Sequence, residues 1–133
     1  ISNFAKKICR HNMKYWNCEP YIGFGAAAHS YFNHTRFANC SDISLYIKGS
    51  EKEYLEKETK EDELFNYIML SLRIDAGINC GYIRHYHQFD FEATHKEKIE
   101  NYIKLGLMIK TKNGYRLTDE GFFVSNTIIS SFF

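Results

Sequence analysis

Near residue 59 the spacing of apolar residues changes, which divides the chain into two parts. Five apolar residues beyond Thr59 recur at the spacing of one helical face: Leu64, Phe65, Ile68, Met69 and Leu72. Thr59 and Asp62 have the spacing of an N-terminal capping pair for this helix, and Gly77 is its expected stop. The first forty residues show no such period. Their short aromatic runs are interrupted by glycines, so we expect strands and loops there.

Further helices are expected beyond the first one. A short helix covers residues 81–88. Another begins at Thr94, because Thr94-x-x-Glu97 has the form of a capping box. Gly106 stands where a left-handed residue commonly ends a helix, so this helix is expected to stop there.

The sharpest turn signal is Asn113-Gly114. It is flanked by the apolar runs 107–111 and 115–117, which predicts a hairpin with a two-residue type I′ turn. Thr118 then caps a last helix. From Phe122 to Phe133 that helix is apolar on most sides, so it has to be buried or to self-associate through exposed apolar surface.

The expected element order gives an α+β chain of three parts. Residues 59–133 follow the order of a winged-helix domain: three helices, a hairpin and a closing helix. Residues 41–58 contain a short helix at 42–48 and an exposed acidic connector. Residues 1–40 contain strands and loops, including a hairpin across residues 31–37.

Charge decides little about partners for the whole chain but more for its segments. The formal net charge is +1, which gives no overall attraction to nucleic acid or to an anionic membrane. Residues 51–63 hold seven acids against three lysines, whereas residues 94–118 hold six basic residues against two acids. A winged helix with this lysine excess suggests DNA binding. Glu97 and Glu100 on the recognition helix would face phosphates, so we do not expect nucleic acid as the partner.

Four cysteines stand at loose spacing: Cys9, Cys18, Cys40 and Cys80. No signal peptide precedes them, which favours a reduced, cytoplasmic setting. No apolar run approaches the roughly 20 residues that span a bilayer. A zinc site built from Cys9, His11 and Cys18 fits the usual ligand spacings poorly, so no metal site is expected.

The motif that decides the family lies in the first thirty residues. It reads Cys9-x-His11-Asn12-x-x-Tyr15-Trp16, and then Gly23-x-Gly25-x-x-Ala28-His29-Ser30. This sequence resembles the haem-chaperone branch of the radical-SAM proteins related to oxygen-independent coproporphyrinogen III oxidase. The run Ile1–Ala5 and the closing Leu117-Thr118-x-x-Gly121 also match the family. The resemblance covers the chain except for the acidic stretch around 50–58.

The resemblance implies a role for each half of the motif. His11, Asn12, Tyr15 and Trp16 are the candidate haem-binding residues, because an imidazole ligates haem iron and aromatic rings pack on a porphyrin. In the alternative interpretation, His11 and Asn12 bridge backbone groups in a loop while Trp16 fills the core. The candidate substrate or cofactor loop contains Gly23, Gly25, His29 and Ser30. The family usually has Pro-Gly where this chain has Ala26-Ala27, so we expect a different or less constrained loop backbone.

The family's catalytic cluster motif, C-x-x-x-C-x-x-C, is absent from these 133 residues. The resemblance therefore implies a non-catalytic C-terminal fragment, with residues 1–40 the end of a radical-SAM barrel domain that lies upstream. At full length it implies a 4Fe-4S cluster, S-adenosylmethionine and haem. Haem binding and transfer is the expected function, with porphyrinogen oxidation and DNA binding as alternatives. Catalysis is not expected of His29-Ser30 or of His85 and His87.

Overall fold

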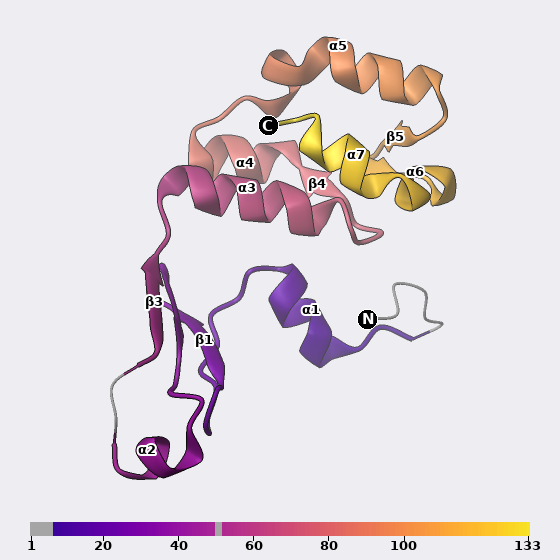
Figure 1. Ribbon diagram of the computed structural model, residues 1–133. Helices are drawn as coiled ribbons and strands as arrows, with labels where there is room; N and C mark the ends of the chain where they lie inside the picture. The colour runs from indigo at the N-terminus through magenta and orange to yellow at the C-terminus, as the bar shows by residue number, and fades with distance from the viewer. Residues whose placement is uncertain (1–6, 50–51) are drawn as a thin grey trace. The chain divides into compact units, whose positions relative to one another are not determined.

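The computed structural model describes residues 7–49 and 52–133 (Figure 1). The run Ile1–Ala5, part of the family resemblance, lies outside the described residues. The chain forms two compact units. The helical unit consists of the residues up to Asn17 together with Leu64–Phe133, and the sheet unit consists of Cys18–Glu63. Both units contain helices and strands, so the chain is a mixed helix-and-strand protein.

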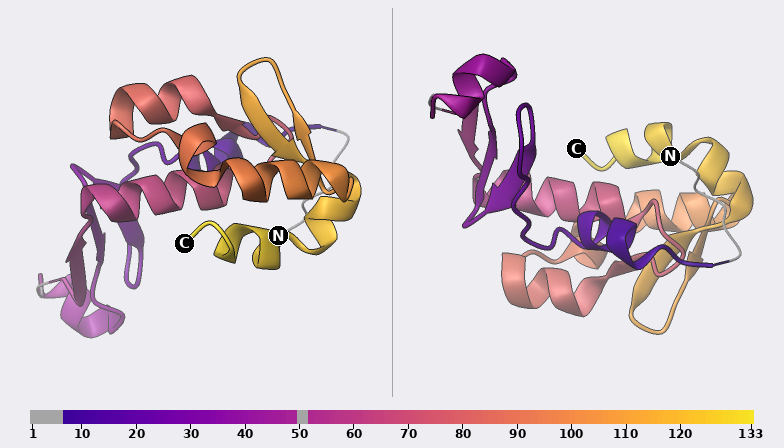
Figure 2. Two further views of the ribbon diagram at one scale, coloured as in Figure 1. Left: turned by 90° about the horizontal axis from the view of Figure 1, so that it is seen from above. Right: turned by 90° about the horizontal axis from the view of Figure 1, so that it is seen from below.

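The helical unit contains six helices and three strands within the described residues. Its helices are α1 (Arg10–Trp16), α3 (Lys60–Ser71, which starts in the sheet unit), α4 (Cys80–His87), α5 (Phe91–Lys104), α6 (Asp119–Phe123) and α7 (Ser125–Ser130). Its strands are β4 (Ile78–Asn79), β5 (Met108–Lys110) and β6 (Gly114–Leu117), which pair antiparallel in the order β4-β6-β5. The β5–β6 hairpin extends as an arm beside α5 (Figure 2).

The apolar core of the described chain lies in this helical unit. It is assembled from α3, α4, α5, both hairpin strands and α7, and its members are Ile68, Leu72, Ile78, Cys80, Ile83, Phe91, Ile99, Met108, Tyr115, Leu117, Ile128, Ile129 and Phe132. Burying this many large side chains is what holds the short helices in place, since isolated helices of this length are marginal in water.

The sheet unit is a three-stranded antiparallel sheet with one short helix. The strands β1 (His29–Phe32), β2 (Thr35–Ala38) and β3 (Tyr54–Lys57) pair in the order β1-β2-β3, and α2 (Ile43–Ile47) lies between β2 and β3 in sequence. The hairpin expected across residues 31–37 is confirmed by the β1–β2 register. Its two turn residues, Asn33 and His34, both have positive φ, the geometry of a type I′ turn.

The structure tests three helix starts that were predicted from capping residues. Thr59 and Asp62 cap α3 reciprocally, because each accepts a hydrogen bond from the other's backbone N–H, and this expectation is confirmed. The cap at Thr118 is also confirmed, since its hydroxyl accepts from the Gly121 N–H at 3.1 Å. The start expected at Thr94 is wrong. The helix begins at Phe91, because Asp90 accepts from the Ala93 N–H and the helix continues through a kink at His95.

Three other expectations are corrected by the structure. Residues 10–16 form a helix where strands and loops were expected, and residues 54–57 of the acidic connector form an edge strand with exposed side chains. The last helix is broken at Val124 into α6 and α7. Burial there is also incomplete, since Phe123 is 83% exposed.

The turn expected at Asn113-Gly114 lies one residue earlier. Thr111 and Gly114 pair across the hairpin, so Lys112 and Asn113 form the turn, and neither Asn113 nor Gly114 has a positive φ. Gly114 is instead required by packing. A Cβ on it would lie 2.2 Å from the backbone oxygen of Ile78 on β4.

Candidate functional site

The helix α1 carries the candidate haem-binding residues. It starts after Cys9, which has extended backbone geometry but makes no side-chain cap, and no residue of α1 is buried. His11 and Asn12 are exposed, Tyr15 is 41% exposed and Trp16 is half-buried. The alternative in which Trp16 fills the core while His11 and Asn12 bridge a loop is therefore wrong. These residues belong to an exposed helix.

His11 and Tyr15 lie one helical turn apart and contact each other. The Tyr15 hydroxyl and the His11 Nε2 atom are 3.1 Å apart, a hydrogen bond, and the two rings meet edge to face with centroids 5.2 Å apart. An exposed imidazole with a neighbouring aromatic ring suits a planar metalloporphyrin, because the ring nitrogen ligates iron and the aromatic ring packs beside the macrocycle. Ligation through Nε2 requires that the hydrogen bond to Tyr15 be exchanged for the bond to iron.

The candidate loop from Gly23 to Ser30 lies in the sheet unit and is held by its own hydrogen bonds. Ser30 is buried, and its hydroxyl accepts from the Gly23 N–H at 3.0 Å. The Asn39 amide donates to the Gly25 carbonyl at 2.9 Å, and the Gly25 N–H donates to the Tyr46 hydroxyl at 3.1 Å. A Cβ at Gly23 would lie 2.4 Å from the backbone oxygen of His29, so only glycine fits.

His29 and Ser30 are not brought together. His29 is exposed and Ser30 is buried, as expected for neighbours on a strand, so the pair has no nucleophile-base geometry. The loop also contains Ala27 with φ +58°, a conformation that glycine adopts without strain. His11, Asn12, Tyr15 and Trp16 belong to the helical unit and the loop belongs to the sheet unit.

An ionic cluster in the sheet unit has no counterpart in the sequence-based expectations. Glu58 is buried and pairs with Arg36, whose guanidinium also lies 4.6 Å from the Tyr31 ring centre. Burial, reinforced by the charge of Glu58, raises the pKa of Tyr31 to about 12. Burial also raises the pKa of the Cys18 thiol, which keeps it protonated at neutral pH. The sequence did not predict this pair, because Glu58 lies in an acid-rich run and such runs are usually exposed to solvent.

A second group of side chains that the sequence analysis did not predict is a cluster of tyrosines. Tyr67 of α3 stacks on Tyr82 of α4 at 4.6 Å between ring centres, and Tyr82 meets Tyr86 at 4.5 Å. The i,i+4 spacing of Tyr82 and Tyr86 was the available signal. Among the described residues, no group of three His, Cys, Asp or Glu side chains is arranged to hold a metal ion. No helix in residues 7–49 or 52–133 combines the length and apolar character needed to cross a bilayer.

Comparison with known proteins shows what this chain is similar to. The family model described as the HemN C-terminal domain matches residues 59–124. The heme chaperone HemW of Bacillus subtilis (strain 168) is 29% identical over 139 residues, covering 99% of this chain and 37% of that protein. The heme chaperone HemW of Lactococcus lactis subsp. lactis (strain IL1403) is 27% identical, with 99% of this chain and 36% of that protein covered.

Two further similarities extend the comparison. The mitochondrial radical S-adenosyl methionine domain-containing protein 1 of Mus musculus is 26% identical, covering 97% of this chain and 33% of that protein. The solved structure of Escherichia coli coproporphyrinogen III oxidase (HemN), described as a radical SAM enzyme, superposes with a TM-score of 0.66 at 17% identity, covering 86% of this chain and 28% of that one. The chain spans about a third of the length of these relatives. The chain is therefore similar to HemN and HemW proteins, and its residues 59–124 match the HemN C-terminal domain.

Proposed function

We propose that this chain is the C-terminal part of a haem chaperone and that α1 contributes to binding and transferring haem. The observation that carries the proposal is the exposed His11 one turn before Tyr15 on α1. Similarity to proteins named heme chaperone HemW supports it. His11 would be the iron ligand, Tyr15 and Trp16 would pack against the porphyrin, and Asn12 would lie at its edge. In this proposal haem is the transported molecule, and its iron accepts His11 as a ligand.

The proposal includes the rest of the domain organisation. The order α3-β4-α4-α5-β5-β6-α6 supports a winged-helix domain in residues 59–133, joined by an acidic connector (41–58) to the end of a radical-SAM barrel domain (1–40). In the full-length protein the upstream domain would hold the 4Fe-4S cluster and S-adenosylmethionine, since the cluster motif is absent from this sequence. The likeness to the oxidase structure shows the fold alone and does not favour porphyrinogen oxidation.

Binding of DNA by the winged helix is not favoured by the charges around α5. Lys98 donates to the backbone oxygen of Ser131, and Lys110 lies 3.8 Å from Glu92. Asp90, Glu92 and Glu100 line the same surface hollow as the basic residues Arg84, Lys96 and Lys110. A phosphate backbone laid there would meet three carboxylates. Any DNA binding through these lysines should weaken steeply as salt rises, and salt-independent binding would count against it.

Haem titration of the full-length protein tests the proposed function. Replacing His11 by Ala should abolish the Soret shift that accompanies iron ligation, whereas His85→Ala, an exposed histidine on α4, should leave it unchanged. Tyr15→Phe keeps the ring and removes the hydroxyl that competes for Nε2. It should leave haem affinity equal or raise it by up to about fivefold, the value of one exposed hydrogen bond. An unchanged Soret band in His11→Ala removes the ligand assignment.

A further inference from the structure

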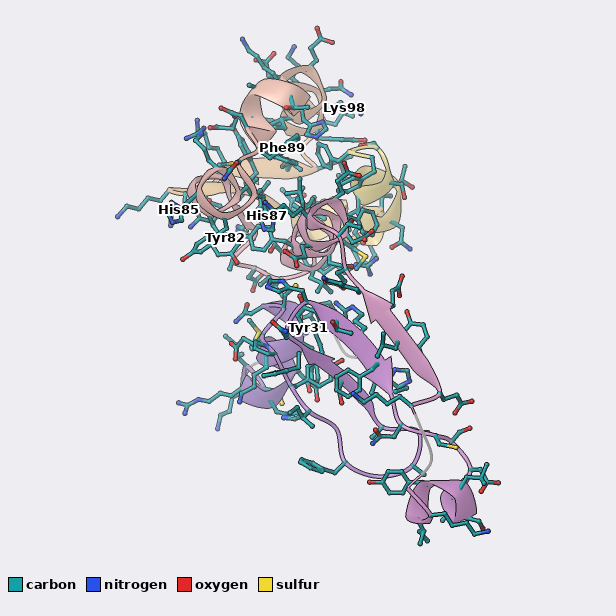
Figure 3. All side chains as sticks on the ribbon, turned by 90° about the vertical axis from the view of Figure 1, so that its left-hand side faces the viewer. Tyr31, Tyr82, His85, His87, Phe89 and Lys98 are labelled. Atoms are coloured by element: carbon teal, nitrogen blue, oxygen red, sulfur yellow. The ribbon has the colours of Figure 1, made fainter. Side chains whose placement is uncertain are left out.

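The helical unit contains a stack of three tyrosines that the proposed haem helix does not use. The Tyr67 and Tyr82 rings are nearly parallel, 25° apart, and the Tyr86 ring contacts Tyr82 at a tilt of 36°. His87 lies 5.9 Å from both the Tyr67 and Tyr82 ring centres. Figure 3 labels Tyr82, His85 and His87 along α4. Tyr82 is 40% exposed, so its ring is available to a ligand while remaining held by its neighbours.

A pocket of about 440 Å³ is lined by the inner two tyrosines of this stack. Its volume is in the range of small-molecule sites, roughly 300–1,000 Å³. Ile74 and Ile78 supply apolar lining beside Tyr67 and Tyr82. The Tyr67 ring is fixed in place, because its hydroxyl accepts a hydrogen bond from the Asn79 N–H at 3.2 Å. The pocket therefore offers a planar ligand a rigid aromatic wall.

The polar part of the lining favours an anionic ligand. Its charged side chain is Lys112, on the β5–β6 turn, and no Asp or Glu lines the pocket. Within the described part of the chain, Lys112 is exposed and takes part in no ion pair. Asn17, Asn79 and Asn113 add amide groups around the rim. An aromatic wall with one cation and several amides matches a flat ring system that carries carboxylates.

We propose that this tyrosine pocket, defined by Tyr67, Tyr82 and Lys112, binds one edge of a porphyrin through aromatic contact and a carboxylate contact. The choice of porphyrin among planar carboxylates rests on the proposed haem function. The site itself is distinct from the iron ligand on α1, because aromatic contact and charge recognise the macrocycle and its carboxylates without needing the metal. Asn17, which caps the end of α1, also lines the pocket.

Titration of the full-length protein with iron-free protoporphyrin, followed by fluorescence, separates the two sites. This probe cannot be ligated by His11, so His11→Ala should bind it as tightly as the unaltered protein. Tyr82→Leu should weaken binding about threefold to tenfold, the range of an aromatic contact. Lys112→Gln should weaken it up to about fivefold at low ionic strength, the range of an exposed ion pair.

Two variants of the same helix serve as controls. Tyr86→Leu removes an exposed ring that stacks on Tyr82 but does not line the pocket, and it should change affinity less than about twofold. Tyr82→Phe keeps the ring and should bind like the unaltered protein, which distinguishes a lost aromatic contact from lost folding. Equal affinity in Tyr82→Leu, or equal weakening by Tyr82→Leu and Tyr86→Leu, overturns the proposal. If His11→Ala keeps haem ligation while Tyr82→Leu loses protoporphyrin, the α1 assignment fails and the pocket stands.

Discussion

Ala27 has a backbone conformation that is unfavourable for a residue with a Cβ atom. Its φ of +58° lies in the left-handed region, where a Cβ costs an L-residue about 1–2 kcal/mol. The family pattern that the first thirty residues resemble has glycine at this position. The side chain of Ala27 is exposed, so little packing depends on it, and alanine holds this backbone conformation at the cost of strain.

Ala27→Gly is expected to stabilise the sheet unit by about 0.5–1 kcal/mol, because relief of strain exceeds the added entropy of the unfolded chain. The measurement is the midpoint of urea unfolding. Ala26→Gly is the matched control. Its φ lies outside the left-handed region, so glycine there should destabilise by a similar amount. Two variants with equal and negative effects would show that Ala27 is unstrained.

Tyr115 gives the helical unit a dependence on alkaline pH. Its side chain is 7% exposed and donates to Glu92 at 2.7 Å, and burial followed by this contact raises the pKa of Tyr115 to about 12. An unfolded tyrosine titrates near about 10. A raised pKa means that the folded state holds the proton more tightly. The stabilisation is thus complete below about pH 10 and is lost as pH rises toward about 12.

Tyr115→Phe should lower the free energy of unfolding at neutral pH by about 1 kcal/mol, the value of one hydrogen bond. It should also make the loss of stability between about pH 10 and 12 shallower than in the unaltered protein. Urea unfolding at several pH values measures both. Since Tyr31 titrates in the same range, only the difference between the two proteins is assigned to Tyr115. Parallel curves would contradict this assignment.

At the scale of elements, Gly114 of the β5–β6 hairpin is required by its packing against β4 and not by the conformation of the turn. Gly114→Ala should destabilise the helical unit by about 2–3 kcal/mol, because the new Cβ meets the Ile78 oxygen and pushes β4 away from β6. Asn113→Ala, in the exposed turn, should change stability by less than about 0.5 kcal/mol. Thermal unfolding of both variants measures this. A larger loss for Asn113→Ala would restore the type I′ interpretation.

Local signals predicted the elements whose determinants are close in sequence. The reciprocal contacts of Thr59 with Asp62 and the cap at Thr118 depend on side chains three residues away, and both were readable. The sequence also predicted the two strands of the hairpin at 108–117, but it did not predict which residues form the turn. The position of Gly114 depends on Ile78, 36 residues earlier, and no local pattern contains that contact.

The same reasoning explains the missed parts of the candidate sites. Residues 54–57 form a strand because β2 pairs with them, and Glu58 is buried because Arg36 meets it across 22 positions. The tyrosine stack likewise joins α3 to α4, with Tyr67 and Tyr82 15 positions apart. The contact between His11 and Tyr15 is local, but it exists only because residues 10–16 are helical, which the sequence did not predict.

At the scale of the whole molecule, the two units differ in how much apolar surface they bury. The described core belongs to the helical unit, whereas Ala38 is the buried apolar residue among the described residues of the sheet unit. The sheet unit instead exposes large apolar side chains: Ile22, Phe24, Ile43, Leu45, Ile47 and Leu55. The chain spans about a third of its relatives' length. We therefore expect the part of the full-length protein that lies outside this chain to cover this surface.

Replacing Ile43 and Ile47 by serine tests this, because both side chains project from α2 and are 67% and 78% exposed. In the 133-residue chain alone, the double variant should bind less hydrophobic dye and elute more completely as a monomer. In the full-length protein it should lower the free energy of unfolding by about 3 kcal/mol or more, since each buried isoleucine contributes roughly 1.5–3 kcal/mol. Lys48→Ser, at the end of the same helix, should change neither. A full-length protein of unaltered stability would show that the rest of the protein leaves this surface open, and a dimer that dissociates in the double variant would assign it to a second copy of the chain.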